Sequence, residues 1–133
     1  MKKHLLMLAL ASTCFAATHA SAMTQDEYKA AKQQIEADYK SAKAQCDAMK
    51  DNAKDVCQKE AKGKEDVAKA ELEQQYKPSD AHARKVAEEK VKTTYEVAKE
   101  KCDDQKGEAK DACVKQAKAD ESQGKADIKA MKK

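Results

Sequence analysis

The chain has 133 residues, of which 27 are Lys or Arg and 24 are Asp or Glu, so its formal net charge is +3 at pH 7. Basic and acidic residues alternate along the whole length and form no basic face, which argues against a nucleic-acid partner. The chain has no Trp, one Phe and one Pro, and its mean hydropathy is −0.97. A composition this rich in Ala, Lys, Glu and Gln predicts an all-α protein.

Residues 1–22 are typical of a secretory signal peptide. A basic start and a short apolar run precede Ala20 and Ala22, which fit an A-x-A cleavage site before Met23. The apolar run is too short to span a membrane. Cys14 follows a residue that suits lipoprotein processing poorly, so ordinary cleavage is expected. We therefore expect export to the periplasm or the exterior, where disulfides persist, and a mature domain 23–133 without an integral membrane span.

An internal repeat with four cysteines dominates the mature sequence. Tyr39–Lys62 aligns without gaps with Tyr95–Lys118 at an offset of 56, and thirteen of the twenty-four positions are identical. Each copy contains one Cys-x10-Cys unit. The two units are Cys46/Cys57 and Cys102/Cys113. An even number of cysteines in a small exported chain predicts a framework of two disulfides.

Two long helices are expected, from about 24 to 76 and from about 80 to 130, joined by a turn at 77–80. Thr24 and Glu27 have the spacing of a capping box at the start of the first helix. Pro78 cannot stand inside a helix, and Ser79 or Asp80 can cap the helix that follows. The sequence therefore predicts one helical domain with a single reversal at Pro78.

The apolar positions pass through both cysteines of a unit without a change of helical phase. Ile35, Cys46, Cys57 and Ala68 follow one another at eleven-residue spacing, which is close to three helical turns. On a continuous helix the two cysteines would lie about 16 Å apart, too far for a disulfide. The phase therefore favours pairing between antiparallel helices. The connectivity that such a hairpin requires is Cys46–Cys113 with Cys57–Cys102.

The expected fold is a long antiparallel two-helix hairpin, similar to a coiled coil and clasped by two interhelical disulfides. The alternative is a short four-helix bundle in which each cysteine pairs locally. That bundle needs turns near Asn52 and Gly107, and both residues tolerate turns. The unbroken apolar phase favours the hairpin.

No pattern of residues indicates a catalytic or metal site. His82 stands alone beside the turn, the glycines are isolated, and a Cys-x-x-Cys motif is absent. Four thiolates could bind Zn²⁺ together only in the bundle. Acidic residues mostly neighbour lysines at helical spacing, which is typical of a solvated ion-pair surface. We therefore expect a protein that is not an enzyme and that has neither cofactor nor metal.

The tyrosines are the only aromatic residues after the expected cleavage, and they are the candidates for a partner surface. Packing across the hairpin is the alternative role for most of them. The candidates are Tyr28, Tyr39, Tyr76 and Tyr95.

Two groups of known proteins are similar to parts of this chain. The segments Cys46–Cys57 and Cys102–Cys113 resemble, in geometry, the twin Cys-x9-Cys helical hairpins of the mitochondrial intermembrane space, which pair outer with outer and inner with inner cysteines. The segments Tyr39–Ala70 and Tyr95–Lys118 are similar to small exported bacterial Ala/Lys-rich helical proteins of the TolA-like, cell-envelope type. The membrane anchor and C-terminal domain of TolA have no counterpart here, so this resemblance implies a compartment and no mechanism.

The expected function is that of a non-enzymatic structural or interaction protein of the periplasm and cell envelope. A disulfide-stapled rod would act as a spacer or adaptor, through a protein partner or self-association. The alternative is a stress-protective or chaperone-like periplasmic protein that shields clients with its charged helices.

Overall fold

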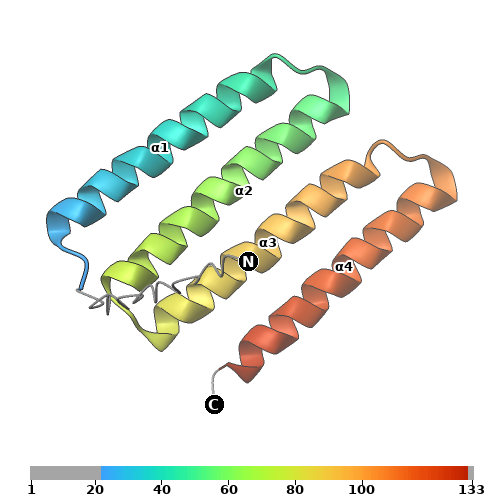
Figure 1. Cartoon of the computed structure of the whole chain (residues 1–133). Helices are drawn as coiled ribbons and strands as arrows, with labels where there is room; N and C mark the ends of the chain where they lie inside the picture. Colours follow the sequence, from blue (N-terminus) through green and yellow to red (C-terminus); the bar gives the residue numbers. More distant parts are fainter. Residues whose placement is uncertain (1–21, 132–133) are drawn as a thin grey trace, which may run out of the picture.

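The computed structural model describes residues 22–131, which contain four helices and no strand. The helices are α1 (Gln25–Asp47), α2 (Asp51–Tyr76), α3 (Asp80–Cys102) and α4 (Gly107–Ala130) (Figure 1). The expected signal peptide lies outside the described residues except for Ala22, which precedes α1 together with Met23.

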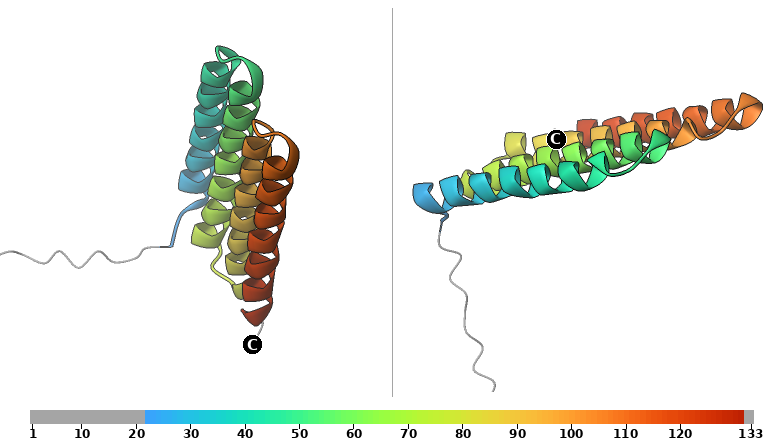
Figure 2. Two further views of the ribbon diagram at one scale, coloured as in Figure 1. Left: turned by 90° about the vertical axis from the view of Figure 1, so that its right-hand side faces the viewer. Right: turned by 90° about the horizontal axis from the view of Figure 1, so that it is seen from above.

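The helices lie side by side in a single layer, in the order of the chain (Figures 1 and 2). Within residues 22–131, α2 packs against α1 and α3, and α4 packs against α3 alone. Helices α1 and α4 are therefore the edges of the layer, and no second layer formed by residues 22–131 covers either face. The buried residues are few and mostly small, and they include Cys46, Ala61, Ala70, Leu72, Cys102, Ala117 and Ile128.

Capping residues start α1 and α3 where the sequence predicts. The Thr24 hydroxyl accepts a hydrogen bond from the Glu27 backbone N–H, and the Glu27 carboxylate accepts one from the Thr24 N–H at 2.7 Å. After Pro78, the Ser79 hydroxyl accepts a hydrogen bond from the His82 N–H at 3.0 Å. These bonds satisfy backbone donors that a helix leaves unpaired in its first turn.

Each of the two expected long helices is broken by a turn between its cysteines. Helix α2 begins at Asp51 with φ 52°, and α4 begins at Gly107 with φ 56°. These residues occupy equivalent positions in the repeat, 56 residues apart. A left-handed backbone is free of strain for Gly and tolerated by Asp. The same backbone conformation thus reverses the chain at the same place in both copies.

The disulfides join cysteines that are neighbours in the sequence. Cys46 bonds Cys57 and Cys102 bonds Cys113, with Cα–Cα distances of 5.4 and 5.7 Å. The predicted two-helix hairpin and its bonds Cys46–Cys113 and Cys57–Cys102 are therefore wrong. The turn after α1 takes up about one helical turn of residues, so the apolar phase continues although the chain reverses. The alternative with four helices and local cysteine pairs fits, as an open layer and not a closed bundle.

Candidate binding surface

Each disulfide fixes the register of a helical hairpin. Counting outwards from Cys46–Cys57, Ala42 lies opposite Ala61, and Ala61 is only 6% exposed. The equivalent pair in the second hairpin is Ala98 and Ala117, and Ala117 is 4% exposed. Small side chains at these positions let the two helices of each hairpin approach closely near the disulfide.

From these small residues away from each disulfide, the two helices of a hairpin border an open apolar groove. The α1–α2 groove has a volume of about 270 Å³ and the α3–α4 groove about 190 Å³. Equivalent residues line both grooves. The apolar lining is Ile35, Tyr39, Ala42, Ala61 and Ala68 in the first groove, and Val91, Tyr95, Ala98 and Ala117 in the second.

Both grooves have a charged rim. Asp38 and Lys64 line the first groove, and Lys90 and Asp120 line the second. Lys64 and Asp120 are equivalent positions in the repeat and carry opposite charges. The apolar floors are thus duplicated while the rims differ in charge pattern, so the grooves suit similar apolar groups with different polar neighbours.

The two grooves open on the same face of the layer. Helices α1 and α3 run in the same direction, with α2 between them, so the second hairpin follows the first across the layer without turning over (Figure 1). Equivalent residues line both grooves, so they must lie on equivalent sides of their hairpins. This face therefore presents two apolar grooves, one beside the other.

The four candidate tyrosines separate into two pairs with different roles. Tyr28 and Tyr76 stack with their ring centroids 4.5 Å apart at the end of the first hairpin away from its disulfide. The Tyr28 hydroxyl donates a hydrogen bond to the Glu73 carboxylate, which raises the pKa of Tyr28. Tyr39 and Tyr95 instead line the two grooves. The structure thus assigns one pair to packing and the other to the candidate binding surface.

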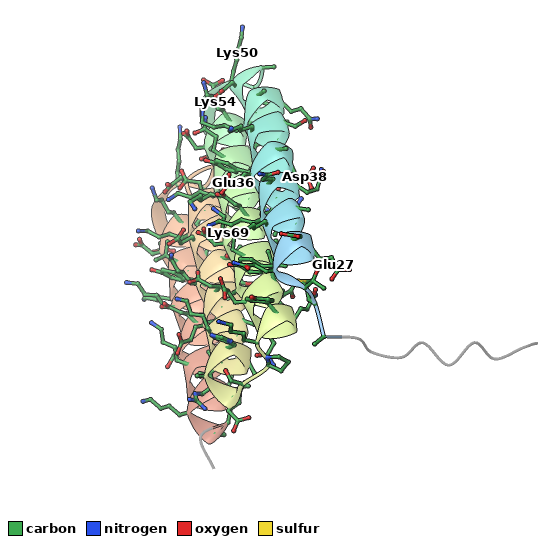
Figure 3. All side chains as sticks on the ribbon, turned by 90° about the vertical axis from the view of Figure 1, so that its left-hand side faces the viewer. Glu27, Glu36, Asp38, Lys50, Lys54 and Lys69 are labelled. Atoms are coloured by element: carbon green, nitrogen blue, oxygen red, sulfur yellow. A yellow bond between two sulfur atoms is a disulfide. The ribbon has the colours of Figure 1, made fainter. Side chains whose placement is uncertain are left out.

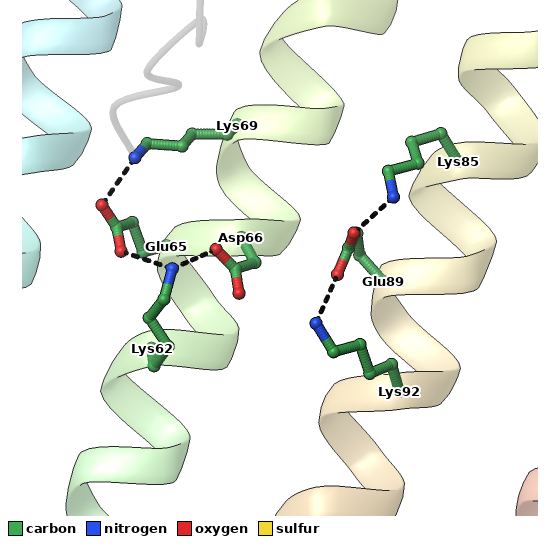
Figure 4. A network of polar contacts seen from close by, with 7 residues as sticks. All are labelled: Lys62, Glu65, Asp66, Lys69, Lys85, Glu89 and Lys92. Atoms are coloured by element: carbon green, nitrogen blue, oxygen red, sulfur yellow. Dashed lines mark hydrogen bonds and ion pairs between the residues drawn. The ribbon is translucent and has the colours of Figure 1, made fainter.

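A buried carboxylate anchors lysine side chains beside the first groove. Glu65 is 8% exposed, and its two oxygens accept hydrogen bonds from Lys62 at 3.1 Å and Lys69 at 2.7 Å (Figure 4). Burial raises the pKa of Glu65, but the two lysine bonds outweigh burial and leave this pKa below its usual value. The Lys62 ammonium also lies 5.9 Å from the centre of the Tyr39 ring. The network thus places positive charge against the groove aromatic.

A second network lies on α3. Glu89 accepts a charged hydrogen bond from Lys85 at 2.7 Å, and Lys92 lies 3.8 Å from its other oxygen (Figure 4). The bond from Lys85 is the main cause that lowers the pKa of Glu89. His82 is held by its ring Nδ1, which lies 2.6 Å from the Lys77 carbonyl oxygen. The Glu89 carboxylate is thus paired with lysine, and the His82 ring is held against a backbone carbonyl.

Metal binding gains no support from the cysteines, which are all in disulfides among the residues that the structure describes. Among residues 22–131, no group of three His, Cys, Asp or Glu side chains is placed to hold a metal ion. None of the four helices is long and apolar enough to cross a membrane.

Sequence reasoning did not identify three parts of this surface. Ile35 and Val91 line the grooves, and the buried Glu65 anchors the lysines beside the first one. The signal for the first two is the repeat itself, because they stand at the same position relative to Tyr39 and Tyr95. No sequence signal distinguishes Glu65 from the many exposed acids that neighbour lysines.

Comparison of the chain with protein families, with curated protein sequences and with solved structures finds no match. A functional proposal therefore rests on the structure of residues 22–131 itself.

Proposed function

We propose that this chain is a non-enzymatic, chaperone-like protein that acts after export and binds exposed apolar segments of other polypeptides in its two grooves. The observation that carries the proposal is the duplicated groove on one open face, with Tyr39 and Tyr95 at equivalent places. Burying an apolar side chain contributes roughly 1.5–3 kcal/mol. Two adjacent grooves can thus bind one segment at two points, which strengthens weak individual contacts.

The disulfides support this role by replacing a large core. A single layer of helices buries little apolar surface, and small domains with a limited core need such covalent links. With the hairpins closed by Cys46–Cys57 and Cys102–Cys113, the grooves can stay open without collapse of the fold. The disulfides also favour an oxidising compartment, in agreement with the expected export.

A spacer or adaptor of the cell envelope is less well supported. That function was based on two helices of about 53 residues, each about 80 Å long. The longest helix has 26 residues, or about 39 Å. The molecule is therefore a short plate and lacks the length that favours a spacer.

The test is suppression of aggregation of a client protein that unfolds on heating without added reductant, measured by light scattering. The variant Ile35→Gln/Val91→Gln replaces a branched apolar side chain in each groove with a polar amide. We expect it to need about tenfold more protein for the same protection, as the loss of about 1.4 kcal/mol of binding free energy implies. The matched control is Ala53→Gln/Ala109→Gln, which adds the same side chains at equivalent exposed positions near the turns.

Circular dichroism and the mass of the oxidised protein must show that both variants keep their helices and disulfides. Equal protection by the groove variant and its control would refute the proposal. Recovery of one specific envelope protein at fixed stoichiometry, without protection of clients, would favour the adaptor.

A further inference from the structure

The outer edges of the layer are related by the repeat to the interface at its centre. Helix α2 is covered by α1 on one side and by α3 on the other, whereas α1 and α4 each have one helical neighbour. In the repeat, α4 is equivalent to α2, and α3 is equivalent to α1. The uncovered side of α4 therefore corresponds to the side of α2 that meets α3. The uncovered side of α1 corresponds to the side of α3 that meets α2.

The α2–α3 interface shows what these two sides do when they meet. The helices lie in close contact where Gly63 meets Thr93, because a Cβ added at Gly63 would overlap the Thr93 side chain. Ion pairs flank this point, with Lys101 2.8 Å from Glu60. Lys90 likewise lies 2.6 Å from Glu71. The interface thus combines a close backbone approach with polar bridges at its margins.

The corresponding outer sides carry small and neutral residues that no other described part of the chain covers. We call them the α4 face, with Ala112, Gln116, Ala119, Gln123 and Ala126, and the α1 face, with Ala30, Gln34, Ala37, Ser41 and Ala44. All ten are exposed. None is charged, although 38% of the chain is Asp, Glu, Lys or Arg. Viewed from the α1 edge, the charged side chains of Glu36 and Asp38 point to opposite sides and leave this strip between them (Figure 3).

We infer that the α4 face binds the α1 face of a second copy of this chain, in the register of the α2–α3 interface. In that register Ala119 meets Ala37 of the second copy, where Gly63 meets Thr93 within the chain. Ala119 has one methyl group more than Gly63, and Ala37 has a smaller side chain than Thr93. The two helices can therefore still approach closely. The second copy is the partner that fits, because the chain already contains this interface once.

The two ion pairs at the margins have compatible replacements as well. Glu60 and Lys101 correspond to Gln116 and Gln45, which can form an amide–amide hydrogen bond instead of an ion pair. Gln116 at present donates to Asp120 at 2.7 Å on the exposed helix surface, and its amide oxygen can still accept a bond. Glu71 and Lys90 correspond to Asp127 and Gln34, so neither ion pair of the α2–α3 interface becomes a pair of like charges.

Such a contact is heterologous, because it joins two different faces. Each added copy presents a new free α4 face or α1 face, so the layer extends by addition of further copies unless the twist closes a ring. The contact uses the edges and leaves the two grooves of every copy open, so it does not depend on the proposed binding of clients.

The experiment uses protein expressed from the whole 133-residue sequence, with both disulfides intact and the N-terminus defined by mass spectrometry. Sedimentation velocity from micromolar to millimolar concentration should show species that grow with concentration. Ala37→Glu blocks the α1 face and Ala119→Glu blocks the α4 face, since each places an unpaired charge in the contact. Each variant alone should weaken association by about tenfold or more.

Mixing the two variants gives the decisive result. Ala37→Glu keeps a working α4 face and Ala119→Glu keeps a working α1 face, so an equimolar mixture should form a dimer that contains one of each and grows no further. Ala81→Glu, at an exposed position of the inner helix α3, is the matched control and should associate like the original protein. Both Ala and Glu favour helices, so folding should be preserved in all three.

Three results would overturn the inference. The first is an original protein that stays monomeric at millimolar concentration. The second is self-association that survives in either single variant, which would indicate pairing of like faces. The third is a mixture that contains no heterodimer.

Discussion

The two hairpins of this protein share a skeleton but differ at the end away from the disulfide. Leu72 and Ile128 are equivalent and both are buried, at 5% and 7% exposure. The first hairpin then closes with the stacked rings of Tyr28 and Tyr76. The position equivalent to Tyr28 in the second hairpin is Arg84. The second hairpin thus forms without an aromatic stack at this end, and we expect the stack to add stability to the first hairpin only.

The largest expected effect comes from removing the disulfides one at a time. For cysteines 11 residues apart, closure of the loop contributes about 3 kcal/mol to the free energy of unfolding. We expect Cys102→Ser/Cys113→Ser to expose α4 to hydrogen exchange more than Cys46→Ser/Cys57→Ser exposes α1. The second hairpin lacks the aromatic stack that would hold its helices together. Equal hydrogen exchange of α1 and α4 in the two variants would show that the aromatic stack does not stabilise the first hairpin relative to the second.

The next largest effect is expected at the junction between the hairpins. Gly63→Ala would force the new methyl group into Thr93, and such overpacking costs typically about 1–3 kcal/mol, measured by urea denaturation. Gly63→Ala/Thr93→Ala should recover most of this loss, because it reproduces the Ala119 and Ala37 pair of the outer faces. Failure of the double variant to recover would mean that the junction cannot accept two alanines, and would weaken the inferred contact between copies.

A smaller effect is expected from the aromatic stack itself. Tyr28→Ala removes both the contact with Tyr76 and the hydrogen bond to Glu73, and should cost about 1–2 kcal/mol of stability in thermal unfolding. Arg84→Ala is the matched change in the second hairpin and should lie within about 0.5 kcal/mol of the original protein. If both variants lost the same stability, the ends of the hairpins would be equivalent after all.

The smallest effect is a dependence on acid. The pKa of Glu65 is lowered in the folded chain, so this carboxylate stabilises the fold at pH values above its unfolded pKa, near 4.5. The stabilisation is lost as the pH falls below that value through the folded pKa. Glu65→Gln should reduce the slope of the free energy of unfolding against pH in this range. The reduction should be smaller than the loss of a fully buried ion pair would cause, because the lysine partners of Glu65 are partly exposed.

The sequence predicted the helical composition, the capping box at Thr24 and the reversal at Pro78, because each depends on local chemistry. The disulfide pairing could not be obtained from periodicity, since a turn that occupies about one helical turn preserves the apolar phase. Gly107 was a visible turn signal. Asn52 indicated a turn at the corresponding place in the first copy, but the residue with positive φ is Asp51, which resembles the many exposed Asp residues inside the helices of this chain.

The candidate surface was predicted only in part. Tyr39 and Tyr95 line the grooves, as a surface role for tyrosines suggests, but no local pattern separates them from Tyr28 and Tyr76. The difference between the two pairs of tyrosines depends on which helix lies opposite each ring. The predicted two-helix hairpin placed other residues opposite these rings. A groove is a property of packing between helices, and the sequence could not define it until the turns were known.

Pairing of successive cysteines also determines how this chain can mature. A polypeptide that emerges N-terminus first exposes Cys46 and Cys57 while Cys102 and Cys113 are still within the exit channel. Every helix contact in residues 22–131 is between neighbours along the chain, and folding through such local contacts is fast. If the expected signal peptide is removed together with Cys14, an oxidant that joins the remaining cysteines in their order of appearance produces the native bonds directly. The protein can complete its folding and oxidation one hairpin at a time, without the slow reshuffling that crossed disulfides would require.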